Sequence, residues 1–257
     1  MPILAKADQS MFKGTVSFSA RIRGNGLTIP LFTFNPSKQG VDNVDIEGPN
    51  GDEILSTVHL ASIPTRENGR SLATEVNTAA LNRISFCHDI AIENARITNT
   101  AFSQVPPQSD AHLETNVGDY IHVGDSVSFV LGLDPTQLKT ELEQASHRGE
   151  QYFGLYRSAR QSGSPVEEFM NLYQILMILF SDIQRDIDAF IVGQEPAVPQ
   201  TQHPKKSPGT METIYSRLRN EFGHDRSGVN LDDTKKDMAA RLGGLIAITK
   251  RAIELKT

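Results

Sequence analysis

The segment RNEFGH, residues 219–224, contains the residue types that a phosphate-cleaving site needs. Arg219 is followed directly by Asn220, and His224 lies five positions after the arginine. Histidine can take a proton from a ribose 2′-hydroxyl, or give one to a leaving oxygen, near neutral pH. The planar fork of arginine holds phosphate oxygens and offsets the charge of the transition state. With Asn220 to position either group, these residues suffice for metal-independent RNA cleavage by the 2′-hydroxyl.

This chemistry requires a helix end inside the segment. In a continuous helix, five positions separate two side chains by about 140° around the axis, so Arg219 and His224 would diverge. Gly223 predicts a helix end, after which the chain turns back and both side chains reach one surface. A structural interpretation stays open, because the helix dipole favours an arginine near a C-terminus and a histidine can cap the last carbonyls. The residues alone favour that structural interpretation.

The second part of the chain has the apolar periodicity of helices only. Ser164 and Pro165 predict a helix start, with Glu167 completing a capping box. Residues 193–209 contain four prolines and predict a long mobile connection. The expected helices cover residues 152–160, 164–191, 210–222 and 228–255. They predict an all-α bundle of four helices within residues 136–257, with RNEFGH at the junction of the last two.

The first part of the chain predicts strands. Residues 12–24 alternate apolar and polar, and 27–34 return from the turn Gly24-Asn25-Gly26 as a second strand, with Pro30 at a sheet edge. Further strands are expected at 53–63 and 120–133, and a packed helix at 71–92. The sequence therefore predicts an α+β protein, with a strand-rich domain over residues 1–135 and the bundle over 136–257.

A helical bundle with Arg219-Asn220, three residues and His224 at the turn into the last helix resembles the HEPN superfamily. The resemblance covers about residues 150–257 and implies a homodimer in which two motifs face each other. It implies an endoribonuclease of defence or toxin-like systems, with Arg219, Asn220 and His224 as catalytic residues. The alternative is a HEPN-like dimerisation or interaction module that has lost catalysis. In nucleotide-silenced members a tyrosine follows the motif histidine by two residues, whereas this chain has Arg226, so that regulation is not expected.

The whole chain also resembles MauJ-type proteins, through residues 157–169 and the segment that begins at Arg219. That label derives from methylamine-utilisation gene clusters and assigns no chemistry. It leaves open an accessory role for the non-catalytic alternative.

Four further cations are candidates for binding RNA. Arg217 and Arg226 flank the motif, and Lys205 and Lys206 lie in the proline-rich connection, where a solvated loop is the simpler interpretation. Cys87 and His88 are expected to serve helix packing. The histidines lack metal-ligand spacing and no cofactor motif is present, so we expect neither a metal nor a cofactor.

Composition sets the remaining limits. The net charge is −6, and its acidic excess lies before residue 150, so any contact with single-stranded RNA must come from a local cluster. No apolar run has the length of a membrane span, the N-terminus lacks a signal peptide's apolar segment, and Cys87 is the single cysteine. These features predict a cytoplasmic protein without membrane contact. The N-terminal domain is expected to bind a protein partner, sense a signal or restrain the bundle.

Overall fold

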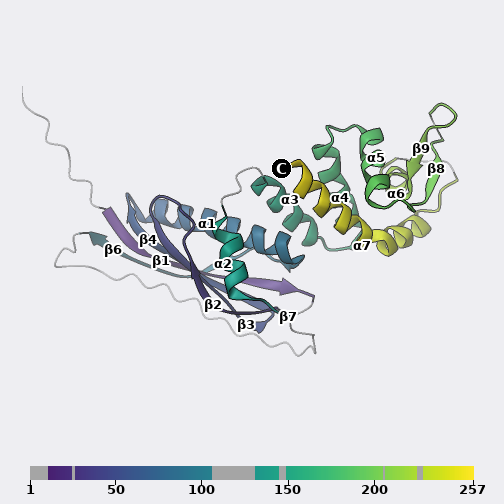
Figure 1. The fold of residues 1–257 in the computed structure, drawn as a ribbon. Helices are drawn as coiled ribbons and strands as arrows, with labels where there is room; N and C mark the ends of the chain where they lie inside the picture. The colour runs from purple at the N-terminus through teal and green to yellow at the C-terminus, as the bar shows by residue number, and fades with distance from the viewer. Residues whose placement is uncertain (1–10, 25–26, 106–130, 145–148, 205, 225–227) are drawn as a thin grey trace, which may run out of the picture. The chain divides into compact units, whose positions relative to one another are not determined.

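The computed structural model describes residues 11–24, 27–105, 131–144, 149–204, 206–224 and 228–257. The chain forms two compact units, residues 1–146 and 147–257. The first is rich in strands and the second in helices, so the predicted mixed α+β class is confirmed (Figure 1). Within the described ranges, none of the helices is both long enough and apolar enough to cross a membrane.

Unit 1 is built on a seven-stranded sheet. Its strands are β1 (Met11–Arg23), β2 (Leu27–Phe34), β3 (Val41–Gly51), β4 (Glu53–Ile63), β5 (Ala91–Ile92), β6 (Arg96–Val105) and β7 (Leu131–Gly132). The order is β5-β1-β4-β3-β2-β7, and β6 also pairs with β1. All pairs are antiparallel except β2 with β7.

One face of the sheet forms the core of unit 1 with helix α1 (Arg66–His88). The alternation predicted for the first strand is confirmed, because Val16, Phe18, Ala20 and Ile22 are all buried. Helix α1 begins five residues before the predicted start, because Thr65 caps it by accepting a hydrogen bond from the Asn68 N–H at 3.1 Å.

The predicted hairpin between the first two strands is wrong. Strand β1 lies between β4 and β6, and β2 pairs with β3 and β7. A turn signal indicates a reversal of the chain but does not choose the neighbour of a strand. Pro30 falls within a register shift of the β2–β3 pair and so donates no ladder bond there. Of the strand expected at 120–133, residues 120–130 lie outside the described part of the chain.

Helix α2 (Pro135–Glu143) belongs to unit 1, although the sequence assigned its residues to the bundle. Leu138 and Leu142 are buried in the sheet core. The Arg83 guanidinium, from α1, donates to the Glu141 carbonyl at 2.8 Å at the end of α2. Apolar packing thus holds α2 in the sheet core, and the Arg83 bond joins its C-terminal end to α1.

Unit 2 contains five helices and a short hairpin among its described residues. They are α3 (Glu150–Arg160), α4 (Pro165–Leu179), α5 (Gln184–Gln194), β8 (Gln200–Gln202), β9 (Met211–Thr213), α6 (Ile214–Gly223) and α7 (Leu231–Lys256). Helix α4 packs along α7, and α3 and α6 pack beside them. The Ser164 cap is confirmed, since its side chain accepts from the Glu167 N–H at 3.2 Å.

The long helix predicted over 164–191 is wrong: the chain breaks between α4 and α5. Ser181 and Asp182 adopt left-handed backbone angles, with φ of 53° and 61°. The reversal brings the rings of Phe180 and Phe190 to 5.1 Å between centroids. Apolar periodicity did not reveal the break, because both helices continue a similar apolar pattern across it.

Part of the connection at 193–209 forms a strand, which the sequence did not predict. Strands β8 and β9 pair in antiparallel register, with Gln200 opposite Thr213 and Gln202 opposite Met211. Residues 211–213, expected to be helical, therefore form a strand. Thr213 then caps α6, because its hydroxyl accepts from the Ser216 N–H at 3.4 Å.

Helices α6 and α7 cross at a glycine. A Cβ atom on Gly244 of α7 would collide with the hydroxyl of Tyr215 on α6. That hydroxyl donates to Oε2 of Glu195 at 2.9 Å, and Tyr215 is buried. The absence of a side chain at 244 thus allows α6 to lie close to α7 while Tyr215 keeps its hydrogen bond.

Candidate functional site

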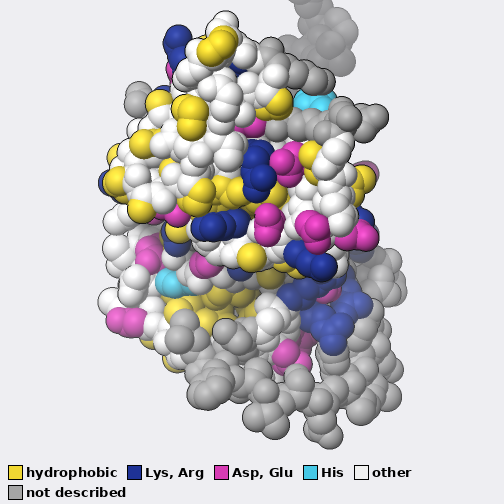
Figure 2. All heavy atoms as spheres, turned by 90° about the vertical axis from the view of Figure 1, so that its right-hand side faces the viewer, with side chains coloured by type: hydrophobic (Ala, Val, Ile, Leu, Met, Phe, Trp, Pro, Cys, Tyr) yellow, Lys and Arg dark blue, Asp and Glu magenta, His cyan; other side chains and the backbone are white. Residues whose placement is uncertain are grey.

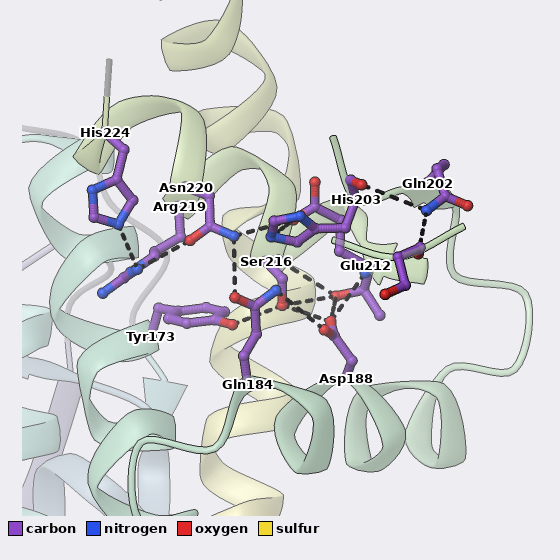
Figure 3. Close-up of polar contacts among 12 residues, drawn as sticks. Tyr173, Gln184, Asp188, Gln202, His203, Glu212, Ser216, Arg219, Asn220 and His224 are labelled. Carbon is purple, nitrogen blue, oxygen red and sulfur yellow. Dashed lines mark hydrogen bonds and ion pairs between the residues drawn. The ribbon is translucent and has the colours of Figure 1, made fainter. Parts of the chain in front are cut away.

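The RNEFGH segment forms the C-terminal end of α6, and the structure brings Arg219 and His224 together. Helix α6 ends at Gly223, and His224 is its C-cap, with extended backbone angles. The His224 N–H donates to the Asn220 carbonyl at 3.0 Å. This turn places Nη1 of Arg219 3.4 Å from Nε2 of His224 (Figure 3). The predicted helix end is confirmed, and the two side chains share one surface.

The contact with Arg219 joins a donor group to an imidazole nitrogen of His224. A guanidinium has only donors, so a hydrogen bond at this distance requires Nε2 to accept and the ring proton to lie on Nδ1. In this arrangement the Nε2 lone pair is directed at the arginine. Such a histidine can take up a proton at Nε2 once the guanidinium moves away.

Arg219 is held from two other sides. Its Nη1 also donates to Oδ1 of Asn220 at 3.0 Å. Its Cζ atom lies 5.9 Å from the ring centroid of Tyr173, within the range of a cation–π interaction. Both Nη1 hydrogens are therefore used within the protein, and Nη2 and Nε carry the remaining N–H donors of the fork.

Asn220 is buried behind Arg219. Its side-chain amide donates to Oε1 of Gln184 at 3.2 Å and to Oε2 of Glu212 at 3.1 Å, while its oxygen accepts from Arg219. With a residue exposure of 4% it is too enclosed to reach a substrate. Asn220 thus fixes the orientation of Arg219 through its own hydrogen bonds.

A second polar network lies beneath Tyr173. The Tyr173 hydroxyl lies 2.7 Å from the Ser216 hydroxyl, which donates to Oδ1 of Asp188 at 2.6 Å. The same carboxylate oxygen accepts from Thr213 through both its N–H and its hydroxyl. Burial raises the pKa of the Tyr173 phenol, which therefore stays protonated. The network anchors the start of α6 to α4 and α5.

A pocket of about 350 Å³ opens between α5 and the β8–β9 hairpin. It is lined by Gln184, Arg185, Asp188, Ala189, Val192, Gln200, His203, Lys206, Thr210 and Met211. Gln184 and Asp188 belong both to this pocket and to the networks behind the motif. His203 lies 3.8 Å from Glu212, the partner of Asn220. The pocket is thus linked to Arg219 through Gln184 and the buried Asn220 (Figure 3).

Of these pocket residues, sequence reasoning named Lys206 and missed Gln184, Asp188 and His203. Gln184 and Asp188 were placed inside one long helix, and His203 in a mobile connection. The available signal was the pair Ser181-Asp182, two residues with low helix propensity inside an otherwise apolar helix.

The remaining candidate cations differ in their surroundings. Arg217 is engaged by Glu221 at 3.5 Å and by Asp237 at 3.7 Å. Lys206 is exposed and lines the pocket. Lys205 and Arg226 lie outside the described residues.

The sequence assigned His88 and Cys87 to helix packing. In the structure, His88 of unit 1 forms a hydrogen bond with Glu141 at 2.8 Å.

On the face shown in Figure 2, Lys and Arg side chains stand beside Asp and Glu side chains. Comparisons with protein-family models, curated proteins and solved structures gave no match.

Proposed function

We propose that this protein is a metal-independent endoribonuclease of the HEPN type. The observation that carries the proposal is the 3.4 Å contact between Arg219 and His224 at an exposed helix end. It joins an acid–base group to a phosphate-binding fork, which is the pair of functions this cleavage requires. The resemblance to the HEPN superfamily in motif spacing adds to this support.

In the proposed reaction the ribose 2′-oxygen is the nucleophile. Its proton moves to Nε2 of His224 while the 2′-oxygen forms a bond to phosphorus. The bond from phosphorus to the 5′-oxygen breaks, and that oxygen takes a proton from water. The products are a 2′,3′-cyclic phosphate and a 5′-hydroxyl end. Arg219 stabilises the charge that accumulates on the phosphate oxygens.

The resting contact between Arg219 and His224 gives this mechanism an order of events. While Arg219 donates to Nε2, the imidazole lone pair is occupied and cannot take the 2′ proton. A phosphate group competes for the guanidinium, because a charge-assisted hydrogen bond to an anion is stronger than one to a neutral imidazole. In the proposed order of events, a phosphate that binds Nη2 and Nε draws the guanidinium toward itself, and Nε2 of His224 is then free to take the proton.

The resemblance further implies that two copies pair with their motifs facing each other. The exposure of His224 leaves it accessible to a second copy. A cytoplasmic role in defence or toxin-like regulation, with unit 1 binding a partner protein, belongs to the same proposal.

The test is a cleavage assay with end-labelled single-stranded RNA in EDTA. We expect the parent protein to leave 2′,3′-cyclic phosphate ends and Arg219→Ala and His224→Ala to be inactive. Arg251→Ala, an exposed arginine of α7, and His59→Ala, on the unit 1 sheet, are the matched controls and should cleave normally. Cleavage that persists in His224→Ala overturns the proposal. Inactivity of the parent at any protein concentration favours the non-catalytic dimerisation module.

A further inference from the structure

The pocket between α5 and the hairpin has a chemically divided lining. Ala189, Val192 and Met211 supply apolar wall, and His203 adds an aromatic ring. Two cations, Arg185 and Lys206, belong to the same lining and are exposed. A ligand that suits this lining has a flat, partly apolar body and an anionic group at one end.

Asp188 supplies an acceptor inside the pocket. Its Oδ1 is occupied by Thr213 and Ser216, at 2.6 to 3.0 Å. Its Oδ2 accepts from the Gln184 amide at 3.4 Å, a long bond that leaves acceptor capacity for a ligand. A carboxylate oxygen selects an N–H donor and disfavours a carbonyl group facing it.

These features match a nucleotide: the flat body is the base, the anionic group is the phosphate, and the donor is an exocyclic amino group. We propose that this pocket binds one nucleotide of the RNA substrate and selects a base that carries an amino group. The inference rests on the proposed ribonuclease function. Asp188 recognises the amino group, while Arg185 and Lys206 bind the adjoining phosphate.

Hydrogen bonds also connect the pocket to the RNEFGH motif. Gln184 lines the pocket and accepts a hydrogen bond from Asn220, which in turn orients Arg219. A base that draws the Gln184 amide toward itself changes the hydrogen bond that Asn220 makes. Recognition of the base and placement of the phosphate-binding arginine are thus connected through two side chains.

Binding can be measured separately from cleavage. The full chain with His224→Ala is titrated with fluorescently labelled oligo(A), oligo(C) and oligo(U), and the anisotropy is recorded. We expect oligo(A) and oligo(C) to bind roughly tenfold more tightly than oligo(U), the value of one charge-assisted hydrogen bond. Equal affinity for all three overturns the inference.

Asp188→Asn is the sharpest variant, because it keeps the shape of the side chain. The asparagine oxygen can keep accepting from Thr213 and Ser216, while an amide donor replaces Oδ2 and the long bond from Gln184 is lost. We expect the preference to shift toward oligo(U), whose base presents carbonyl oxygens. An unchanged preference in a folded Asp188→Asn protein contradicts the assignment. Glu254→Gln, an exposed carboxylate of α7, serves as the matched control.

Ala189→Trp tests the same pocket without touching the Asp188 network. The indole would fill the space beside Val192, and all three oligonucleotides should bind more weakly, with little change in thermal stability. Undiminished binding overturns the inference.

Free AMP as a competitor separates two sources of the ligand, a nucleotide within RNA and a free nucleotide. Competition by AMP as strong as that of oligo(A) would make this a free-nucleotide site and contradict the RNA assignment. If His224→Ala binds oligonucleotides selectively but the parent protein does not cleave RNA, the proposed function is overturned and the assignment of the pocket is kept.

Discussion

The guanidinium of Arg219 lies 3.4 Å from Nε2 of His224 and occupies the nitrogen that would act as the base. Arg219 belongs to α6, and His224 is the residue that caps the C-terminal end of this helix. Their contact depends on the extended backbone of His224 and on the support of Arg219 by Asn220 and Tyr173. Each support can be changed separately, and each change has a distinct expected result.

Replacing Arg219 with lysine tests whether the fork matters beyond its charge. An ammonium group cannot donate to Asn220 and also present two parallel N–H groups to a phosphate. We expect single-turnover RNA cleavage to fall by about a hundredfold in Arg219→Lys, with unchanged urea denaturation. A rate near that of the parent would mean that charge alone suffices.

Asn220→Asp tests the role of Asn220 as a buried connector. The new carboxylate oxygen would lie where the Asn220 amide now donates to Glu212, so two buried negative groups would face each other. We expect a loss of about 3 kcal/mol in the free energy of unfolding, measured in urea. Adding Glu212→Gln supplies a donor to the new carboxylate and should restore part of the lost free energy of unfolding. Failure of this rescue would argue against the Asn220–Glu212 pairing.

The ring and the hydroxyl of Tyr173 have separate roles. Tyr173→Phe removes the bond to Ser216 and keeps the ring under Arg219, so we expect a loss of about 1 kcal/mol in stability and near-normal cleavage. Tyr173→Leu also removes the ring, and cleavage should fall further. Equal cleavage by the two variants would exclude a role for the ring.

The buried phenols predict loss of stability at alkaline pH. Burial raises the pKa of Tyr173 and of Tyr215, the latter also through its bond to Glu195. Above pH of about 10 the unfolded chain releases these protons and the folded chain keeps them, so stability is lost as pH rises from there. Urea denaturation across this range should show a shallower loss in Tyr173→Phe than in the parent. Parallel curves would contradict the linkage.

Glycine at position 181 should stabilise the break between α4 and α5. Ser181 has φ of 53°, a conformation that costs a residue with a Cβ about 1 kcal/mol. We expect Ser181→Gly to raise the free energy of unfolding by up to about that amount. The same change at Ser158, an exposed position within α3, should lower it. A loss of stability at both positions would refute this account.

Local patterns predicted the parts of this protein that depend on neighbouring residues. The alternation of Val16 to Ile22, the cap at Ser164 and the helix end at Gly223 are confirmed, because each follows from a few adjacent side chains. The partner of β1 could not be predicted, since strand pairing depends on contacts distant in sequence.

In the candidate site, too, the sequence predicted the features that depend on adjacent residues. Arg219 and His224 were recognised from a motif six residues long, and the helix end that joins them was visible at Gly223. Glu212 and Gln184 were not, because their roles arise from the reversal at Ser181 and the pairing of β8 with β9. A polar residue within an expected helix or loop gives no local sign that it will contact Asn220.

The crossing at Gly244 shows that tolerance to mutation need not follow solvent exposure. Gly244 is exposed, a location where substitutions usually have small effects. Its Cβ direction nevertheless points at the Tyr215 hydroxyl, so even an alanine would displace Tyr215 from Glu195 or push α6 away from α7. The motif forms the end of α6. A substitution at Gly244, a surface position on α7, would therefore also shift Arg219 and His224 relative to Tyr173.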